Sequence, residues 1–233
     1  MKIAILTIAT NKYISFLPKL IDSIEKKIKF EDVTLFVFTD SDDKHLSNKI
    51  KVINHKITHV PHPLGTMMRY NYYMELEEIL RNYDYIYHLD CDMIVNAEIG
   101  EEILSERVVV LHPSFYENKN PHTFTYDRNS SSNAFVSYSE SLMGVRYYQN
   151  CFQGGSSTEF INMSNKIIKW IEEDLRKNII VLWHDESYMN RYMINNKPTL
   201  ELNPGYAYPE KWNIPFEKKI IHLEKKHTEI RSF

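Results

Sequence analysis

Tyr85-Ile86-Tyr87-His88-Leu89 runs directly into Asp90-Cys91-Asp92 near the middle of the chain. The first five residues predict a buried strand, and the acids that follow place carboxylate oxygens at its carboxyl end. Open α/β sheets bind ligands at this edge. Carboxylates one residue apart suit a hard divalent cation that also holds a phosphorylated substrate. An isolated pair of this kind is more often two solvated acids in a turn, so its meaning depends on the rest of the chain.

Strands and helices alternate along the first half of the chain. Apolar and β-branched runs predict strands at 3–8, 33–38, 51–57 and 85–89, and apolar residues at helical spacing predict helices at 15–29 and 66–82. A polar loop is expected at 41–49. This β-α-β-β-α-β order indicates an α/β protein with a largely parallel sheet of Rossmann type.

The second half is less regular. Strands are predicted at 108–111, 199–202 and 219–223, helices at 164–178 and 183–196, and a polar loop at 117–132. Neither an internal repeat nor a low-complexity linker divides the sequence. We therefore expect a single domain over residues 1–233.

The composition is that of an ordinary globular protein. The 233 residues are 43% hydrophobic and 25% charged, enough for one core without disulfides. The net charge of −3 argues against a general nucleic-acid-binding protein. The sequence has only two cysteines and no signal-peptide pattern, which predicts a soluble cytoplasmic protein. It has no run of about 18 apolar residues, so we expect no transmembrane segment.

A second acidic pair stands in Trp183-His184-Asp185-Glu186-Ser187. The chain has no G-x-G-x-x-G after its first strand, no P-loop, no G-x-S-x-G elbow and no zinc-type cysteine spacing, so the two acidic pairs are the main candidates for chemistry. Acids at a helix start are equally well explained by their favourable interaction with the helix dipole. The pair alone leaves capping and catalysis open.

Residues 183–192, Trp-His-Asp-Glu-Ser-Tyr-Met-Asn-Arg-Tyr, closely resemble the signature of glycosyltransferase family 6. This family contains the ABO blood-group transferases and the α-1,3-galactosyltransferases. Further similar segments follow the family's order: Val37-Phe38-Thr39-Asp40, Asp90-Cys91-Asp92-Met93, Leu111-His112-Pro113-Ser114-Phe115-Tyr116, Phe124-Thr125-Tyr126-Asp127-Arg128, Tyr147-Tyr148 leading to Gly154-Gly155-Ser156, and Asn203-Pro204-Gly205-Tyr206. The resemblance covers the whole chain and is to a soluble bacterial-type catalytic domain.

The resemblance implies a GT-A fold with a mixed central sheet. Residues 1–95 would form a Rossmann-like half that mainly binds UDP. Residues 96–223 would mainly bind the acceptor and the donor sugar, and 224–233 would be a C-terminal tail. The implied activity is a retaining transfer of galactose or N-acetylgalactosamine from the UDP-sugar to the 3-hydroxyl of a β-galactoside. The galactose-terminated acceptor, with or without fucose, would become a blood-group-like α-1,3-linked glycan.

The resemblance also implies a role for each donor-side residue. Asp90 and Asp92 would hold Mn²⁺, or Mg²⁺, against the diphosphate. Tyr13 would stack on uracil in a pocket lined by Ile8, Ala9 and Thr10. Arg69 would reach the acidic pair and the donor sugar, Asp185 would bind donor-sugar hydroxyls, and Lys225 and Arg231 would fold over the diphosphate. Gln149 and Cys151 occupy positions that select the donor sugar, and the bulk of Cys151 favours galactose.

Glu186 is the implied nucleophile, because a carboxylate can stabilise or attack an oxocarbenium-like centre. His112, Thr125 and Trp183, together with Glu186, match acceptor-contacting positions. One departure concerns the acceptor: Pro209 stands where the family has an acid, with Glu210 beside it.

Two other functions compete with this interpretation. A phosphatase of the haloacid-dehalogenase type also places an acidic pair after a strand and uses Mg²⁺. Its nucleophile normally lies on the first strand, however, with a further acidic pair downstream, whereas here the pair is in mid-chain and no Asp-Asp follows it. A non-catalytic nucleotide-sugar-binding protein is the second alternative, and the joint presence of Arg69, Asp90, Asp92 and Glu186 argues against it.

Overall fold

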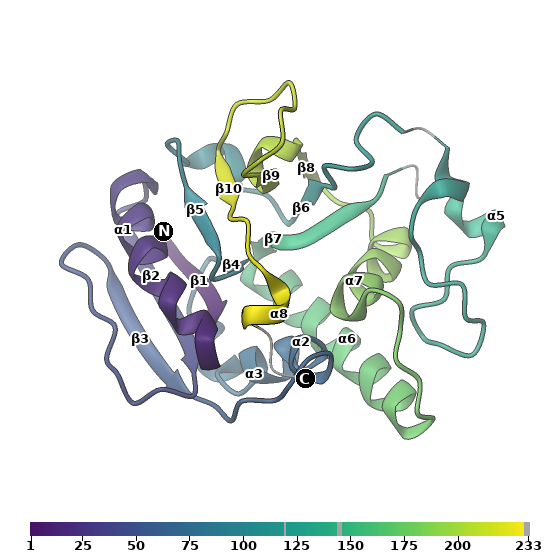
Figure 1. The fold of residues 1–233 in the computed structure, drawn as a ribbon, viewed down its shortest axis with the longest axis horizontal. Helices are drawn as coiled ribbons and strands as arrows, with labels where there is room; N and C mark the ends of the chain where they lie inside the picture. Colours follow the sequence, from purple (N-terminus) through teal and green to yellow (C-terminus); the bar gives the residue numbers. More distant parts are fainter. Residues whose placement is uncertain (119, 144–145, 231–233) are drawn as a thin grey trace.

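A seven-stranded mixed sheet forms the centre of the protein in a computed structural model, which describes residues 1–118, 120–143 and 146–230 (Figure 1). Its strands, in sheet order, are β3 (Lys51–Lys56), β2 (Asp32–Thr39), β1 (Lys2–Ile8), β4 (Tyr85–Leu89), β7 (Tyr148–Ser156), β6 (Arg107–Leu111) and β8 (Leu200–Leu202). The four strands from β3 to β4 are parallel, β7 is antiparallel to both of its neighbours, and β6 pairs with β8 in parallel.

Helices cover both faces of this sheet. The longer helices are α1 (Leu17–Lys27), α6 (Ser157–Arg176) and α7 (His184–Asn195). Short helices and 3-10 turns connect the rest: η1 (Asn11–Phe16), α2 (Leu64–Met67), α3 (Arg69–Met74), α4 (Glu77–Leu80), η2 (Glu101–Ile103), η3 (Pro121–Thr123), α5 (Tyr138–Ser141), η4 (Pro204–Ala207) and α8 (His227–Ile230). A small sheet of β5 (Met93–Val95), β10 (Ile220–His222) and β9 (Tyr208–Pro209) lies beside them.

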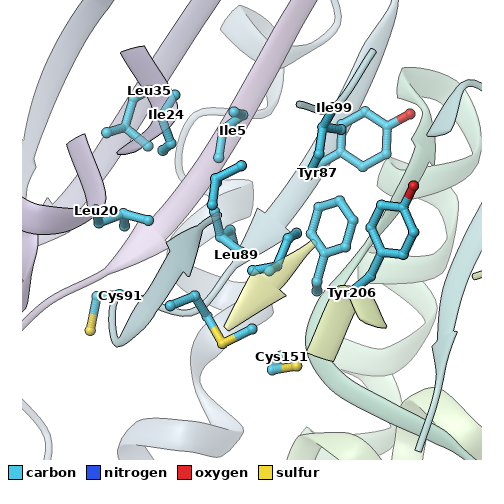
Figure 2. Packing of buried hydrophobic residues seen from close by; sticks show 14 of the residues in the cluster. Ile5, Leu20, Ile24, Leu35, Tyr87, Leu89, Cys91, Ile99, Cys151 and Tyr206 are labelled. Carbon is cyan, nitrogen blue, oxygen red and sulfur yellow. The ribbon is translucent and has the colours of Figure 1, made fainter. Parts of the chain in front are cut away.

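Side-chain alternation along the strands builds two separate core layers. Ile3 and Ile5 of β1 pack with α1 in one hydrophobic cluster, whereas Ala4 and Leu6 belong to a second cluster that includes α3, α6 and α7. Figure 2 shows part of the first cluster, in which Leu20 and Ile24 of α1 lie near Ile5 and Leu35. Because successive side chains of a strand point to opposite faces of the sheet, alternate residues of the same strand pack against the helices on opposite faces.

The predicted α/β class with a mixed central sheet is confirmed, with parallel pairing in β3-β2-β1-β4 and between β6 and β8 and with β7 antiparallel between them. The predicted strands and α7 are present, with small shifts at their ends. Part of the predicted loop at 117–132 forms η3. No helix within the described ranges is long and apolar enough to cross a membrane.

The helix predicted at 66–82 is wrong, because the chain forms α2, α3 and α4 instead. The breaks fall at Met68, with ψ −1°, and Leu76, with ψ 19°. Adjacent buried tyrosines bond in different directions: Tyr72 donates to the carbonyl of Thr58, and the Tyr73 hydroxyl bonds to His88 Nδ1. Both tyrosines lie within α3, and neighbouring side chains on a regular helix also diverge by about 100°, so these two bonds do not explain the breaks.

Strand β7 was not predicted, although it lies at the centre of the second half. It inserts between β4 and β6 and ends at Gly154 and Gly155. A Cβ on Gly154 would lie 2.2 Å from the carbonyl oxygen of Ile86, and Gly155 has φ +147°. These glycines permit the close approach to both neighbours, and α6 then starts at Ser157 rather than at 164.

Gly154→Ala should lower the free energy of unfolding by about 1–3 kcal/mol, because the added methyl group must displace strand backbone. Urea unfolding of the variant and the parent protein measures this. Gly100→Ala is the matched control, since its Cβ would meet nothing closer than a flexible Glu102 oxygen at 3.5 Å. Equal stability of the Gly154 variant and the parent would contradict the close approach of β7 to β4.

Candidate active site

A cavity of about 610 Å³ opens at the carboxyl ends of β1 and β4. Its walls come from η1, the α2–α3 region, the middle of β7, the start of α7 and the segment after β10. Many of the candidate site residues line it: Ile8, Thr10, Tyr13, Arg69, Asp90, Asp92, Gln149, Cys151, Trp183, Asp185, Glu186 and Lys225. The fold thus brings the two acidic pairs, which are far apart in the sequence, into one cavity.

Three candidate residues within the described ranges lie elsewhere. Ala9 is fully buried and its N–H donates to the carbonyl of Phe38, beneath the cavity wall. His112 and Thr125 do not line the cavity. Arg231 lies outside the described residues.

Arg69, the first residue of α3, joins the two acidic pairs. Its Nη2 lies 2.9 Å from Asp90 Oδ1, and its Nε lies 3.1 Å from Asp185 Oδ2. Nη1 donates to the carbonyl of Asn150 at 2.8 Å. Only 11% of the Arg69 side chain is exposed. Burial works against its charge, but Asp185 and then Asp90 more than offset this effect and raise the pKa of Arg69.

Asp90 is held in its ionised form. Burial favours the neutral acid, but the Arg69 guanidinium lowers the pKa of Asp90 well below its usual range. His88 itself is neutral, because burial and the nearby Arg69 lower its pKa to about 4. Arg69 Nη1 can only donate a hydrogen bond to His88 Nε2, so Nε2 must be the unprotonated ring nitrogen. The imidazole therefore carries its proton on Nδ1, which donates to the Tyr73 hydroxyl 2.6 Å away.

Asp92 faces the C-terminal segment of the chain. Its side chain is buried, Lys225 Nζ forms an ion pair with Oδ2, and His222 Nε2 lies 3.5 Å from the same oxygen. Lys225 Nζ also lies 5.5 Å from the centre of the Tyr13 ring. The segment after β10 therefore places a cation between the acidic pair and the aromatic ring.

The donor set of this region fits a hard divalent cation. Asp90 and Asp92 both border the cavity and offer carboxylate oxygens. Among the residues that the structure describes, no cluster of three or more His, Cys, Asp or Glu side chains has a metal-binding arrangement. Two protein carboxylates leave most of the coordination sphere to substrate oxygens and water, as is usual where Mg²⁺ or Mn²⁺ accompanies a diphosphate.

Asp185 and Glu186 stand in the first turn of α7, after a strained residue. His184 has φ +51°, which is unusual for a side chain with a Cβ. The N-cap residue, Trp183, makes no side-chain hydrogen bond to the helix. The side chains of the two acids contact β7 and Arg69.

Glu186 is bound by two donors from the neighbourhood of β7. Tyr147 OH donates to Oε1 and the Asn150 N–H donates to Oε2, both at 3.1 Å. Burial nevertheless raises the pKa of Glu186 to about 7. Asp185 is 3% exposed, and burial raises its pKa to about 6 against the opposing effect of Arg69. Both carboxyl groups therefore titrate close to neutral pH.

Tyr147 links Glu186 to the two acceptor-side candidates outside the cavity. Its hydroxyl lies 3.5 Å from the carbonyl of Thr125, and its carbonyl accepts from the N–H of His112 at 2.9 Å. Glu210, considered as a displaced acceptor contact, instead accepts a bond from the N–H of Glu224 and does not line the cavity.

Several residues around the site were missed from the sequence. Tyr147, Asn150, His88 and His222 contact the acids or Arg69 directly, and Asn190 ties α7 to β7. The only signal for Tyr147 and Asn150 was their place inside segments already singled out by the family resemblance. Asn190 likewise stands inside the 183–192 segment, whereas His88 in β4 and His222 at the end of β10 stand where the sequence gives no sign of their contacts.

Comparisons with known proteins agree with this geometry. The model of glycosyltransferase family 6 matches residues 1–232. The chain is similar to the O-antigen biosynthesis glycosyltransferase WbnI of Escherichia coli, with 31% identity over 97% of this chain and 95% of that protein. It is also similar to histo-blood group ABO system transferase 2 of Rattus norvegicus, with 33% identity over 64% of this chain.

A third relative is globoside alpha-1,3-N-acetylgalactosaminyltransferase 1 of Homo sapiens, 33% identical over 61% of this chain. The matched regions span 45% of the rat protein and 40% of the human one, so the chain covers less than half the length of these animal relatives. The match to the family model, by contrast, takes in nearly every residue of the chain. The chain belongs to glycosyltransferase family 6 and is a glycosyltransferase.

Proposed function

We propose that this glycosyltransferase moves galactose or N-acetylgalactosamine from its UDP-sugar to the 3-hydroxyl of a β-galactoside, with retention and an α-1,3 linkage. The observation that carries this proposal is the meeting of both acidic pairs around Arg69 in one cavity. Its volume of about 610 Å³ falls in the range of small-molecule sites. The α-1,3 activity named for the similar globoside enzyme supports the linkage.

The UDP end of the donor would lie between Tyr13, Lys225 and the first acidic pair. Tyr13 offers a ring for uracil, with Ile8 and Thr10 beside it, and Lys225 and Arg69 offer positive charge to the diphosphate. Asp90 and Asp92 would hold Mn²⁺, or Mg²⁺, which screens the charge on UDP as it leaves. Residues 1–95 would thus bind mainly UDP, and the tail at 224–233 would cover the diphosphate.

The sugar end would lie over the second acidic pair, in the half formed by residues 96–223. Asp185, fixed by Arg69 and Asn150, would accept hydrogen bonds from donor-sugar hydroxyls. Glu186 would stabilise or attack the positively charged anomeric centre, for which it must be ionised. Trp183, 51% exposed at the cavity mouth, offers its indole to the acceptor.

Cys151 bears on the choice of donor. It is 2% exposed, lies in the apolar cluster shown in Figure 2, and also lines the cavity. A donor sugar bound beside it would have less room for an acetamido group than beside a glycine, and Gln149 lines the same cavity. We therefore propose UDP-galactose as the preferred donor, and a blood-group-like glycan as the product.

A screen of UDP-Gal and UDP-GalNAc against plain and fucosylated galactosides tests this function. With Mn²⁺, we expect UDP release from UDP-Gal to exceed that from UDP-GalNAc, and linkage analysis should give an α-1,3 product. EDTA should abolish transfer, and added Mn²⁺ should restore it.

The screen also separates the alternatives. Tight UDP binding without UDP release from either donor would indicate a non-catalytic binding protein. Phosphate release from phosphomonoesters would indicate the phosphatase. Full transfer activity in EDTA would contradict the metal-binding role of Asp90 and Asp92.

Glu186→Gln should lower kcat about 10²–10³-fold or more while changing UDP affinity little, because the lost charge acts on the transition state. The amide can still bond to both Tyr147 and the Asn150 N–H. Its effect on stability should depend on pH. The folded pKa of about 7 lies above the usual value of 4.5, so the stability that Glu186 contributes is full below about pH 4.5 and is lost as pH rises through 7.

The Gln variant should therefore be more stable than the parent at pH 8, and this advantage should shrink towards pH 5. Steady-state kinetics, UDP titration and melting curves on the same two proteins measure all three effects. A near-normal kcat together with a lower melting temperature at pH 8 would show that Glu186 only favours the helix N-terminus.

A further inference from the structure

Asn150 touches three of the proposed site residues through three different groups. Its N–H donates to Glu186 Oε2 at 3.1 Å, and its carbonyl accepts from Arg69 Nη1 at 2.8 Å. Its side-chain Nδ2 donates to Asp185 Oδ2 at 2.7 Å. The residue lies near the middle of β7, is 4% exposed and lines the cavity. It is thus a common contact of both carboxylates and the guanidinium.

The orientation of the Asn150 amide is set by charge. Asp185 as a carboxylate can only accept, so Nδ2 must face it, and the same nitrogen lies 3.4 Å from the Tyr70 hydroxyl. The buried Oδ1 has no hydrogen-bond partner within the part of the chain that the structure describes. A buried side-chain amide whose oxygen makes no hydrogen bond lowers the stability of the fold. The presence of Asn150 is better explained by the hydrogen bond that its Nδ2 donates to the Asp185 carboxylate.

The backbone of this region is held independently of the Asn150 side chain. Asn190 on α7 exchanges two hydrogen bonds with the backbone of Tyr148, at 2.8 and 2.9 Å, and also donates to the carbonyl of Glu186. Helix α7 and strand β7 are therefore clamped two residues away from Asn150. The side-chain amide of Asn150 then fixes the Asp185 carboxylate, and the backbone N–H of the same residue fixes the Glu186 carboxylate.

We propose that Asn150 is a positioning residue that sets Asp185 and Glu186 in one geometry relative to Arg69, so that the donor sugar meets both carboxylates in a single orientation. This inference rests on the proposed function for its kinetic consequence. The geometric claim, that Asn150 fixes the two carboxylates relative to Arg69, does not depend on which substrate binds.

The side-chain bond is tested by Asn150→Ala and Asn150→Asp. Asn150→Ala keeps both backbone bonds and removes the amide, so kcat should fall about 10- to 100-fold, the usual effect of losing a hydrogen bond to a charged group. UDP affinity should stay within about 2-fold, since the amide has no contact with Asp90 or Asp92. Asn150→Asp has the same shape but faces Asp185 with a like charge, so its kcat should be lower still.

A double-mutant cycle shows whether Asn150 acts through Asp185. In an Asp185→Ala background, Asn150→Ala should cause less than about 3-fold further loss of kcat, because its partner is already absent. Asn133→Ala is the matched control. Its Nδ2 donates to the buried carboxylate of Asp174 at 2.8 Å, outside the cavity, so this variant should lower the melting temperature and leave kcat unchanged.

Fully additive losses in the cycle, or an Asn150→Ala protein that behaves like the Asn133 control, would overturn the proposal. Absence of UDP release by the parent protein would contradict the proposed function instead. In that case, crystal structures of the parent and Asn150→Ala proteins decide the positioning role. A rotated Asp185 carboxylate in the variant supports it, and an unmoved one refutes it.

Discussion

The buried guanidinium of Arg69 is the interaction on which the rest of the site depends. It pairs with Asp90 at the end of β4 and with Asp185 at the start of α7, two segments that lie far apart in the sequence. Each of these carboxylates is largely withdrawn from water and would be costly without an opposite charge. The planar fork of arginine presents Nη2 to Asp90 and Nε to Asp185 at the same time.

Strand β7 makes this pairing possible. By inserting antiparallel to β4, it brings a carbonyl to Arg69 and an N–H to Glu186 at one residue, Asn150. The glycines at its end allow the close approach, and Asn190 fixes α7 to its start. The carboxyl ends of the parallel strands of the first half and the acids of the second half therefore meet at one edge of the sheet. The same contacts hold Glu186 buried, with a pKa of about 7.

Much of this could be predicted from the sequence, for identifiable reasons. The parallel strands have apolar runs bounded by polar loops, and both acidic pairs stand beside recognisable elements. Strand β7 has no such pattern, because it is buried on both faces and includes Asn150 and Gln153, whose environment only the fold supplies. The 66–82 segment has helical spacing, but the chain breaks at Met68 and Leu76 into three short helices, and the spacing gives no sign of either break. The family resemblance supplied candidate roles for residues, whereas the contacts of Tyr147, Asn150 and His88 required coordinates.

The most direct test of the role of Arg69 is the free energy of unfolding of Arg69→Met at pH 7.5, compared with the triple variant that also carries Asp90→Asn and Asp185→Asn. The single substitution leaves the buried Asp185 carboxylate and the 27% exposed Asp90 carboxylate without their cation, and it should cost about 3–5 kcal/mol. The triple variant removes those charges and should recover most of that loss. A single variant that loses less than about 1 kcal/mol, or a triple variant that recovers nothing, would contradict the claim that Arg69 holds this site together by charge.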